Sequence, residues 1–62
     1  MKFSIRTVRK RAGMKQDELA RKAGISRITL NGLESGRITN TQTRTLEKIA
    51  DVLGVTAKEL IQ

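Results

Sequence analysis

The chain has 62 residues, no cysteine or histidine, and a formal net charge of +7. A chain of this length forms one small domain, and the missing residue types exclude disulfides, thiolate metal sites and the commonest catalytic base. No apolar run approaches the roughly 20 residues that cross a bilayer. We therefore expect one cytoplasmic domain over residues 1–62 that needs no cofactor, metal or membrane.

The positive charge is concentrated in the first part of the chain. Residues 1–37 contain ten basic residues (Lys and Arg) and three acidic ones (Asp and Glu), whereas residues 38–62 contain three basic and three acidic residues. Such a surface favours a polyanionic partner, because each phosphate that Lys or Arg neutralises releases counterions. The alternative is a solvated basic surface that keeps a small protein in solution.

The first predicted helix spans residues 3–12. Ile5, Val8 and Ala12 recur at helical spacing, with basic residues between them. Gly13 follows where such a helix commonly ends. The apolar face of this helix is narrow.

A second helix is predicted over residues 16–23. Leu19, Ala20 and Ala23 lie on one stripe of this helix. Acidic residues in its first turn and basic residues in its last turn complement the helix dipole. Gly24 lies where a helix commonly ends in a left-handed residue.

A third helix is predicted over residues 26–35. Ser26 offers a side-chain oxygen that caps its start, Leu30 and Leu33 point to one side, and Gly36 supplies the stop. Two short helices joined by a tight glycine turn have the layout of a helix-turn-helix.

The segment 37–43 has no apolar period, which predicts a loop or the fraying start of the next helix. A fourth helix follows and is closed by Gly54. Its apolar residues recur at helical spacing: Leu46, Ile49, Ala50 and Leu53.

A fifth helix is predicted from a capping box. Thr56 and Glu59 have the T-x-x-E spacing, and Val55 and Leu60 are placed as a hydrophobic staple. The chain shows no strand signal. The predicted fold class is therefore all-α, with five short helices.

These signals occur at positions that resemble the Cro and phage-repressor-like (XRE-type) helix-turn-helix DNA-binding domains. The resemblance runs from about Ile5 to Ile61 and rests on Gln16, Leu19-Ala20, Gly24-Ile25-Ser26, Leu30, Leu33-Glu34 and Gly36, with Thr45-Leu46, Ile49-Ala50 and Leu53-Gly54 after them. It implies a lambda-repressor-like fold with the helix-turn-helix at about 16–35, whose second helix enters the major groove. The expected function is sequence-specific transcriptional regulation, by a repressor that occupies a palindromic operator on double-stranded DNA as a homodimer. The alternative within the family is an activator that recruits polymerase, and the sequence does not separate the two.

Ile28 is predicted to point away from the core. With Leu30 and Leu33 on the buried side, helical geometry places Ile28, Asn31, Gly32 and Ser35 on the opposite side. Against DNA, an apolar group such as Ile28 packs on a thymine methyl. The alternatives are a scattered surface hydrophobe and a dimer contact.

Arg27 and Asn31 are the other candidate base-reading residues. The Arg27 guanidinium suits guanine O6 and N7 or a phosphate, and Asn31 suits adenine N6 and N7. Each is alternatively a solvated surface residue. Gly32 departs from the family pattern, which usually has a long polar or charged residue there; it either lets the backbone approach the duplex or only weakens the helix.

Four residues are predicted to contact phosphates. Gln16 stands at a helix N-terminus, where free amide groups favour an anion, and the resemblance implies that it anchors the DNA backbone. Lys15 precedes it, where a capping Ser or Thr is more usual. Arg37 and Arg44 follow the recognition helix, and Arg44 alternatively reaches a minor groove. Simple solvation is the alternative for each.

The resemblance also implies a structural ion pair between Arg9 and Glu34. In related repressor domains, an arginine of the first helix pairs with the glutamate near the end of the recognition helix. Such a pair orients the reading helix and does not touch DNA.

The alternative function is a protein-interaction or antitoxin-like module that keeps the helix-turn-helix as a scaffold. An enzyme is not expected, because no nucleophile and base can be combined without His, Cys or Tyr. No small-molecule site is evident, and a regulator of this kind is nucleoid-associated when bound. For the dimer contact, we expect the last two helices, with Val55, Leu60 and Ile61.

Overall fold

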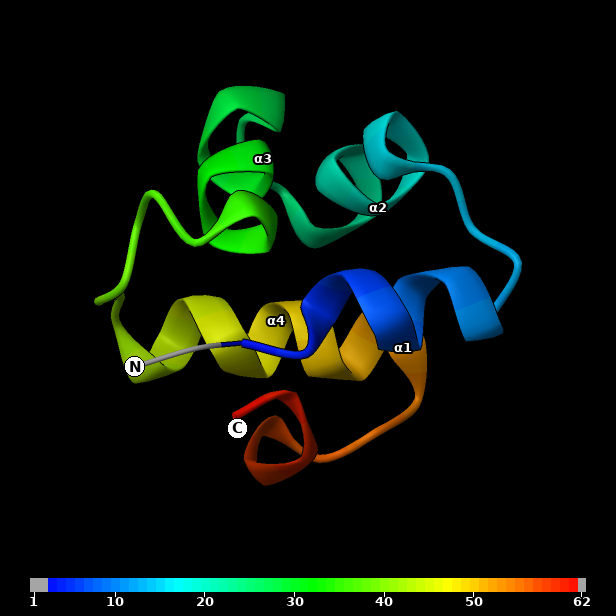
Figure 1. The fold of residues 1–62 in the computed structure, drawn as a ribbon. Helices are drawn as coiled ribbons and strands as arrows, with labels where there is room; N and C mark the ends of the chain where they lie inside the picture. Colours follow the sequence, from blue (N-terminus) through cyan, green and yellow to red (C-terminus); the bar gives the residue numbers. More distant parts are fainter. Residues whose placement is uncertain (1–2, 62) are drawn as a thin grey trace.

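The computed structural model describes residues 3–61, so residues 1, 2 and 62 of the predicted domain lie outside the described residues. Its elements are four α-helices and one turn of 3-10 helix, and their arrangement is shown in Figure 1. They are α1 (Ile5–Arg11), α2 (Gln16–Ala23), α3 (Arg27–Ser35), α4 (Thr43–Leu53) and η1 (Ala57–Leu60). The predicted all-α fold class is confirmed.

The turn between α2 and α3 is built as its residues predict. Gly24 adopts a left-handed conformation with φ of 70°, and its N–H donates to the Arg21 carbonyl at 3.2 Å. The next N–H, of Ile25, donates to the Ala20 carbonyl at 3.0 Å. These two bonds satisfy carbonyls that the helix end leaves free. They turn the chain sharply enough for α3 to pack on α2.

Ser26 caps α3. Its side-chain oxygen accepts a hydrogen bond from the Thr29 N–H at 3.0 Å, and its hydroxyl donates to the Thr29 hydroxyl at 2.8 Å. The cap satisfies one of the free N–H groups at the helix start. α3 therefore begins at a defined residue.

Gly24→Ala is expected to lower the free energy of unfolding by about 1–2 kcal/mol, since an L residue with a Cβ strains in the left-handed region. No heavy atom outside the chain neighbours lies within 4 Å of a Cβ placed there, so the loss reports the backbone conformation alone. Urea unfolding followed by circular dichroism measures it. Gly24→Asn is the control, because Asn tolerates this region better; an equal loss in both variants contradicts the explanation.

The core unites all five elements around α4. In Figure 1, α2 and α3 lie above α1 and α4, and η1 lies below α4. α2 contacts both α3 and α4, α1 contacts α3, and η1 contacts α4. The buried apolar side chains are Ile5, Val8, Leu19, Ala20, Ala23, Leu30, Leu33, Leu46, Ile49, Ala50 and Leu60. The α2–α3 pair is thus held to the rest of the domain by contacts of α2 with α4 and of α3 with α1.

The first helix is shorter than predicted. It begins at Ile5 because the preceding segment pairs with the C-terminal one: the Ser4 N–H donates to the Leu60 carbonyl at 2.7 Å, and Phe3 and Ile61 form an antiparallel bridge. Its end also differs, since Ala12 lies beyond the last helical residue and is exposed. The predicted core role of Ala12 is wrong.

The C-terminal turn departs from the prediction in two respects. It is a 3-10 turn without a side-chain cap, in which the Glu59 N–H donates to the backbone carbonyl of Thr56 at 3.1 Å. Leu60, expected at a dimer contact, has an exposed fraction of 0% and belongs to the core. It is therefore unavailable to a second copy, whereas Ile61 is 41% exposed.

No helix among the described residues combines the length and apolar character that crossing a membrane requires.

Candidate nucleic-acid interface

The outward face of α3 carries the three predicted base-reading residues. Arg27, Ile28 and Asn31 are exposed, whereas Leu30 and Leu33 on the opposite side are buried. Ile28 is 78% exposed, the larger of two such values among the bulky apolar side chains of the described residues. An isoleucine this exposed, at the second position of the helix, offers a methyl-bearing surface to a partner.

Gly32 is not exposed on this face, contrary to the prediction. It is buried, because the segment after α3 folds back over it. A Cβ placed on Gly32 would lie 2.5 Å from Cδ1 and 2.7 Å from Cγ1 of Ile38, and 3.2 Å from Nη2 of Arg37. The Ile38 N–H also donates to the Gly32 carbonyl at 2.9 Å. The glycine therefore makes room for the chain's own loop.

Arg9 and Glu34 form a buried ion pair between α1 and α3. Arg9 Nε donates to Glu34 Oε2 at 2.7 Å, and Arg9 Nη2 donates to Glu34 Oε1 at 3.0 Å. The third nitrogen, Nη1, donates to the Met14 carbonyl at 2.9 Å. The side chains are 10% and 4% exposed. This fork-shaped contact fixes the end of the recognition helix relative to α1 and to the turn before α2.

Gln16 joins the same network. Its Nε2 donates to Glu34 Oε1 at 3.2 Å, which ties the start of α2 to the end of α3. The sequence analysis assigned Gln16 to phosphate binding alone and missed this contact, which joins residues 18 positions apart. No spacing signal reports such a pair, because it depends on how the helices pack. The amide nitrogen has a second N–H that this hydrogen bond does not use.

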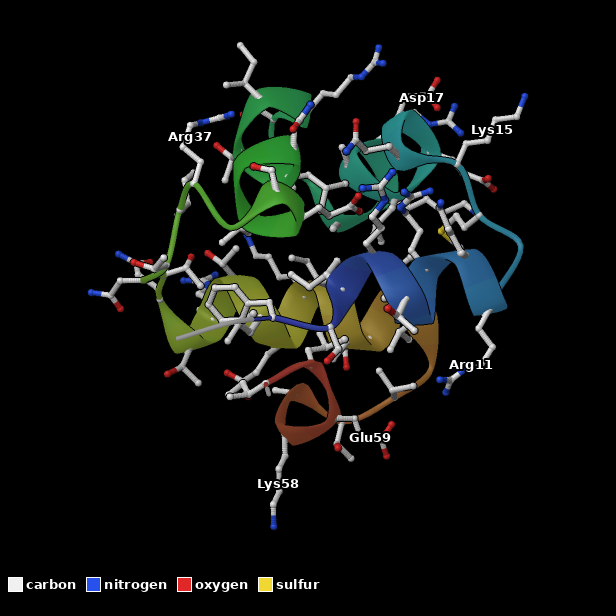
Figure 2. The ribbon with its side chains drawn as sticks, in the orientation of Figure 1. Arg11, Lys15, Asp17, Arg37, Lys58 and Glu59 are labelled. Carbon is white, nitrogen blue, oxygen red and sulfur yellow. The ribbon has the colours of Figure 1, made fainter. Side chains whose placement is uncertain are left out.

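Lys15 lies just before α2, and its ammonium group extends into solvent (Figure 2). Its backbone N–H donates to Glu18 Oε1 at 3.4 Å, and Lys22 Nζ lies 3.3 Å from Glu18 Oε2. The hydrogen bond from Lys22, and secondly that from the Lys15 backbone, lower the pKa of Glu18 from 4.5. The lowered pKa means that these bonds stabilise the fold above pH 4.5 and are lost as the pH falls.

Two of the predicted phosphate contacts lie on opposite sides of the α2–α3 pair. Figure 2 shows Lys15 beside α2 and Arg37 beside α3, with Lys58 and Glu59 at the far end of the molecule. Arg44 is exposed in the first turn of α4. Basic groups therefore flank the outward face of α3.

A hollow of about 300 Å³ opens beside that face, where α1, α2 and α3 meet. The lining includes Arg6 of α1, which the sequence analysis did not single out. The full set of lining residues is polar or charged: Arg6, Arg9, Gln16, Asn31, Glu34 and Ser35. Within residues 3–61, no group of three or more His, Cys, Asp or Glu side chains is placed to hold a metal ion.

Comparison with known proteins identifies the fold. A helix-turn-helix family model matches residues 5–60. The SinR chain of the SinR–SinI complex is 36% identical over 94% of this chain and 56% of its own length, with a TM-score of 0.88. SinR in complex with DNA, described as the master regulator for biofilm formation, is also 36% identical, over 94% of this chain and 92% of its own, with a TM-score of 0.88.

The N-terminal DNA-binding domain of SinR from Bacillus subtilis is 36% identical over 94% of this chain and 84% of that domain, with a TM-score of 0.87. A search of curated proteins found no significant match. The chain spans 56% of the SinR chain in the SinI complex. Because the family model covers nearly all of its helices, this chain belongs to the helix-turn-helix family, as a DNA-binding domain of the XRE type.

Proposed function

We propose that this domain is a sequence-specific transcriptional regulator that represses by occupying a palindromic operator as a homodimer. The observation that carries the proposal is the exposed outward face of α3, with Ile28 at 78% exposure and basic groups on either side. SinR, whose structure matches this chain with a TM-score of 0.88, is described in complex with DNA.

The first two residues of α3 read bases in this proposal. Arg27 and Ile28 lead α3 into the major groove, where the guanidinium meets guanine O6 and N7 and the isoleucine packs on a thymine methyl. Asn31 follows one turn later and suits adenine. The Arg9–Glu34 pair holds α3 in the orientation that this requires.

Lys15, Gln16 and Arg44 contact phosphates in this proposal. Gln16 uses the N–H that Glu34 leaves free, at the positive end of the α2 dipole. Lys15 and Arg44 supply mobile charges from exposed positions. These contacts fix the register of the domain on the duplex without reading its sequence.

Two copies fit on successive half-sites. The domain measures 24 × 22 × 19 Å, which is less than the separation of about 34 Å between half-sites one helical turn apart. A single module of this kind buries on the order of 600 to 1,000 Å² against DNA, too little for tight binding alone. Pairing two copies on a palindrome supplies the remaining affinity.

Binding to mixed-sequence DNA at two salt concentrations tests the proposal. With two cationic phosphate contacts per copy, from Lys15 and Arg44, we expect the affinity to fall roughly 12-fold between 50 and 200 mM salt, because bound counterions are released. Fluorescence anisotropy of a labelled duplex measures this. Absence of binding even at the lower salt contradicts a DNA-binding function.

A protein-interaction module is the second candidate function. The similar SinR chain is described in a complex with SinI, and Ile28 and Ile61 are bulky apolar side chains exposed on this domain. The same titration separates the two, since a domain that serves only as a protein scaffold binds no DNA at low salt.

Base reading and backbone anchoring are separable by substitution. Ile28→Ala and Arg27→Ala are expected to weaken binding to a selected operator by about 1–3 kcal/mol more than binding to mixed DNA, because base contacts are lost. Lys15→Ala is expected to weaken both alike. Operators selected from a random pool provide the specific duplex. Equal behaviour of all three variants contradicts the assigned roles.

A further inference from the structure

The recognition helix has no side chain at Gly32; the Ile38 side chain fills most of the space this leaves, and the tip of the Arg37 side chain lies at its edge. A Cβ at Gly32 would lie 3.2 Å from Nη2 of Arg37. Figure 2 shows the Arg37 side chain extending from the loop toward α3 instead of away from the body. On the helical wheel, Gly32 lies 40° from Ile28, by the regular rotation of about 100° per residue. The guanidinium is therefore at the edge of the outward face.

The backbone that carries Arg37 is anchored on α3. The Arg37 N–H donates to the Ser35 hydroxyl oxygen at 3.4 Å, and that hydroxyl donates to the Gly32 carbonyl at 3.3 Å. The Ile38 N–H donates to the same carbonyl at 2.9 Å, and the Ile38 side chain covers Gly32. The backbone of Arg37 is thus fixed to α3 through its neighbours in the sequence, Ser35 before it and Ile38 after it.

Among the residues that the structure describes, no carboxylate pairs with this guanidinium. The ion pairs within residues 3–61 are Arg9–Glu34 and Lys22–Glu18, and neither includes Arg37. Its five N–H donors stay available to a partner. An arginine so placed, beside a helix that enters a groove, faces base edges as well as the phosphates that border them.

We propose that Arg37 reads a base edge from beside Gly32, where its guanidinium lies at the edge of the outward face of α3. Guanine is the base that suits it, because the planar guanidinium matches O6 and N7 in a bidentate contact. The inference rests on the proposed insertion of α3 into the major groove. This role replaces the phosphate contact that the sequence analysis predicted for Arg37. It also explains the glycine at position 32, because only a residue without a side chain lets the loop that carries Arg37 pack this closely on α3.

The test compares Arg37→Ala, Arg37→Lys and Lys58→Ala on a selected operator, on operators changed at one base pair at a time, and on mixed DNA. We expect Arg37→Ala to weaken binding to the operator roughly 5- to 150-fold and to erase the preference at one base pair. Arg37→Lys keeps the charge but does not restore that preference, since an ammonium lacks the fork geometry. Lys58→Ala, a basic-to-alanine control at the far end of the molecule, leaves both affinities unchanged.

Gly32→Ala provides an independent variant. The added Cβ displaces Ile38 and Arg37, so the same base-pair preference is expected to disappear, and the double variant with Arg37→Ala is expected to lose no further specificity. If Arg37→Ala weakens operator and mixed DNA equally and Arg37→Lys restores both, Arg37 is a phosphate contact and the inference is overturned. Failure of the unsubstituted protein to bind any DNA at low salt instead overturns the proposed function.

Discussion

Glu34→Ala is expected to lower the free energy of unfolding by about 3–5 kcal/mol, because it leaves the Arg9 guanidinium buried without its counter-charge. Arg9 is only 8% exposed, so water replaces little of the lost interaction, and the Met14 carbonyl is its remaining partner. A domain of this size is stable by roughly 3–9 kcal/mol, at 0.05–0.15 kcal/mol per residue. The variant therefore approaches complete unfolding and loses its DNA affinity with its fold.

Urea unfolding followed by circular dichroism measures this effect, and two controls define its origin. Lys22→Ala breaks the exposed pair with Glu18 and is expected to change stability by less than about 1 kcal/mol. The double variant Arg9→Met with Glu34→Leu is expected to lose far less than the two single variants together, since no charge is left buried. Additive losses contradict a coupled pair.

Leu30→Ala is expected to cost about 2–5 kcal/mol, through lost apolar burial and the cavity that remains. Leu30 has an exposed fraction of 0% and, with Leu33, fastens α3 to the rest of the domain. The loss therefore also reduces the fraction of molecules that present an ordered reading face. Thermal or urea unfolding measures the stability change.

Ile28→Ala is the matched control, because it truncates a bulky aliphatic residue two positions away on the same helix. Ile28 is 78% exposed, so its removal is expected to alter stability by no more than about 0.5 kcal/mol. Its effect is expected in DNA binding instead. A large loss of stability in Ile28→Ala contradicts the assignment of this side chain to the outward face.

Local signals in the sequence predicted the helix-turn-helix closely. α2 occupies the predicted residues 16–23, Gly24 adopts the left-handed conformation, and Ser26 caps α3. These features depend on backbone conformation and on partners within a few residues, which the order of residue types reports directly. The buried leucines of α3 followed from helical periodicity for the same reason.

Predictions that depended on distant partners were less successful, apart from the Arg9–Glu34 pair that the family resemblance implied. Gly32 was placed outward by the helical wheel, but Ile38 from the following loop covers it. Leu60 was predicted to lie at the dimer contact, but α4 and the N-terminal segment enclose it in the core. The capping box at Thr56 gave way to a 3-10 turn, because Leu60 and Ile61 pair with Ser4 and Phe3 immediately afterwards.

The sequence by itself determined the all-α class, the boundaries of α2 and α3, and the outward position of Ile28, since each follows from periodicity, glycine turns and capping within about one turn of helix. Only the tertiary structure decided that Gln16 joins Arg9 and Glu34, and that Arg37 lies against Gly32. These contacts join separate elements, so they exist only once the packing of the core has set the distances between the helices and their loops.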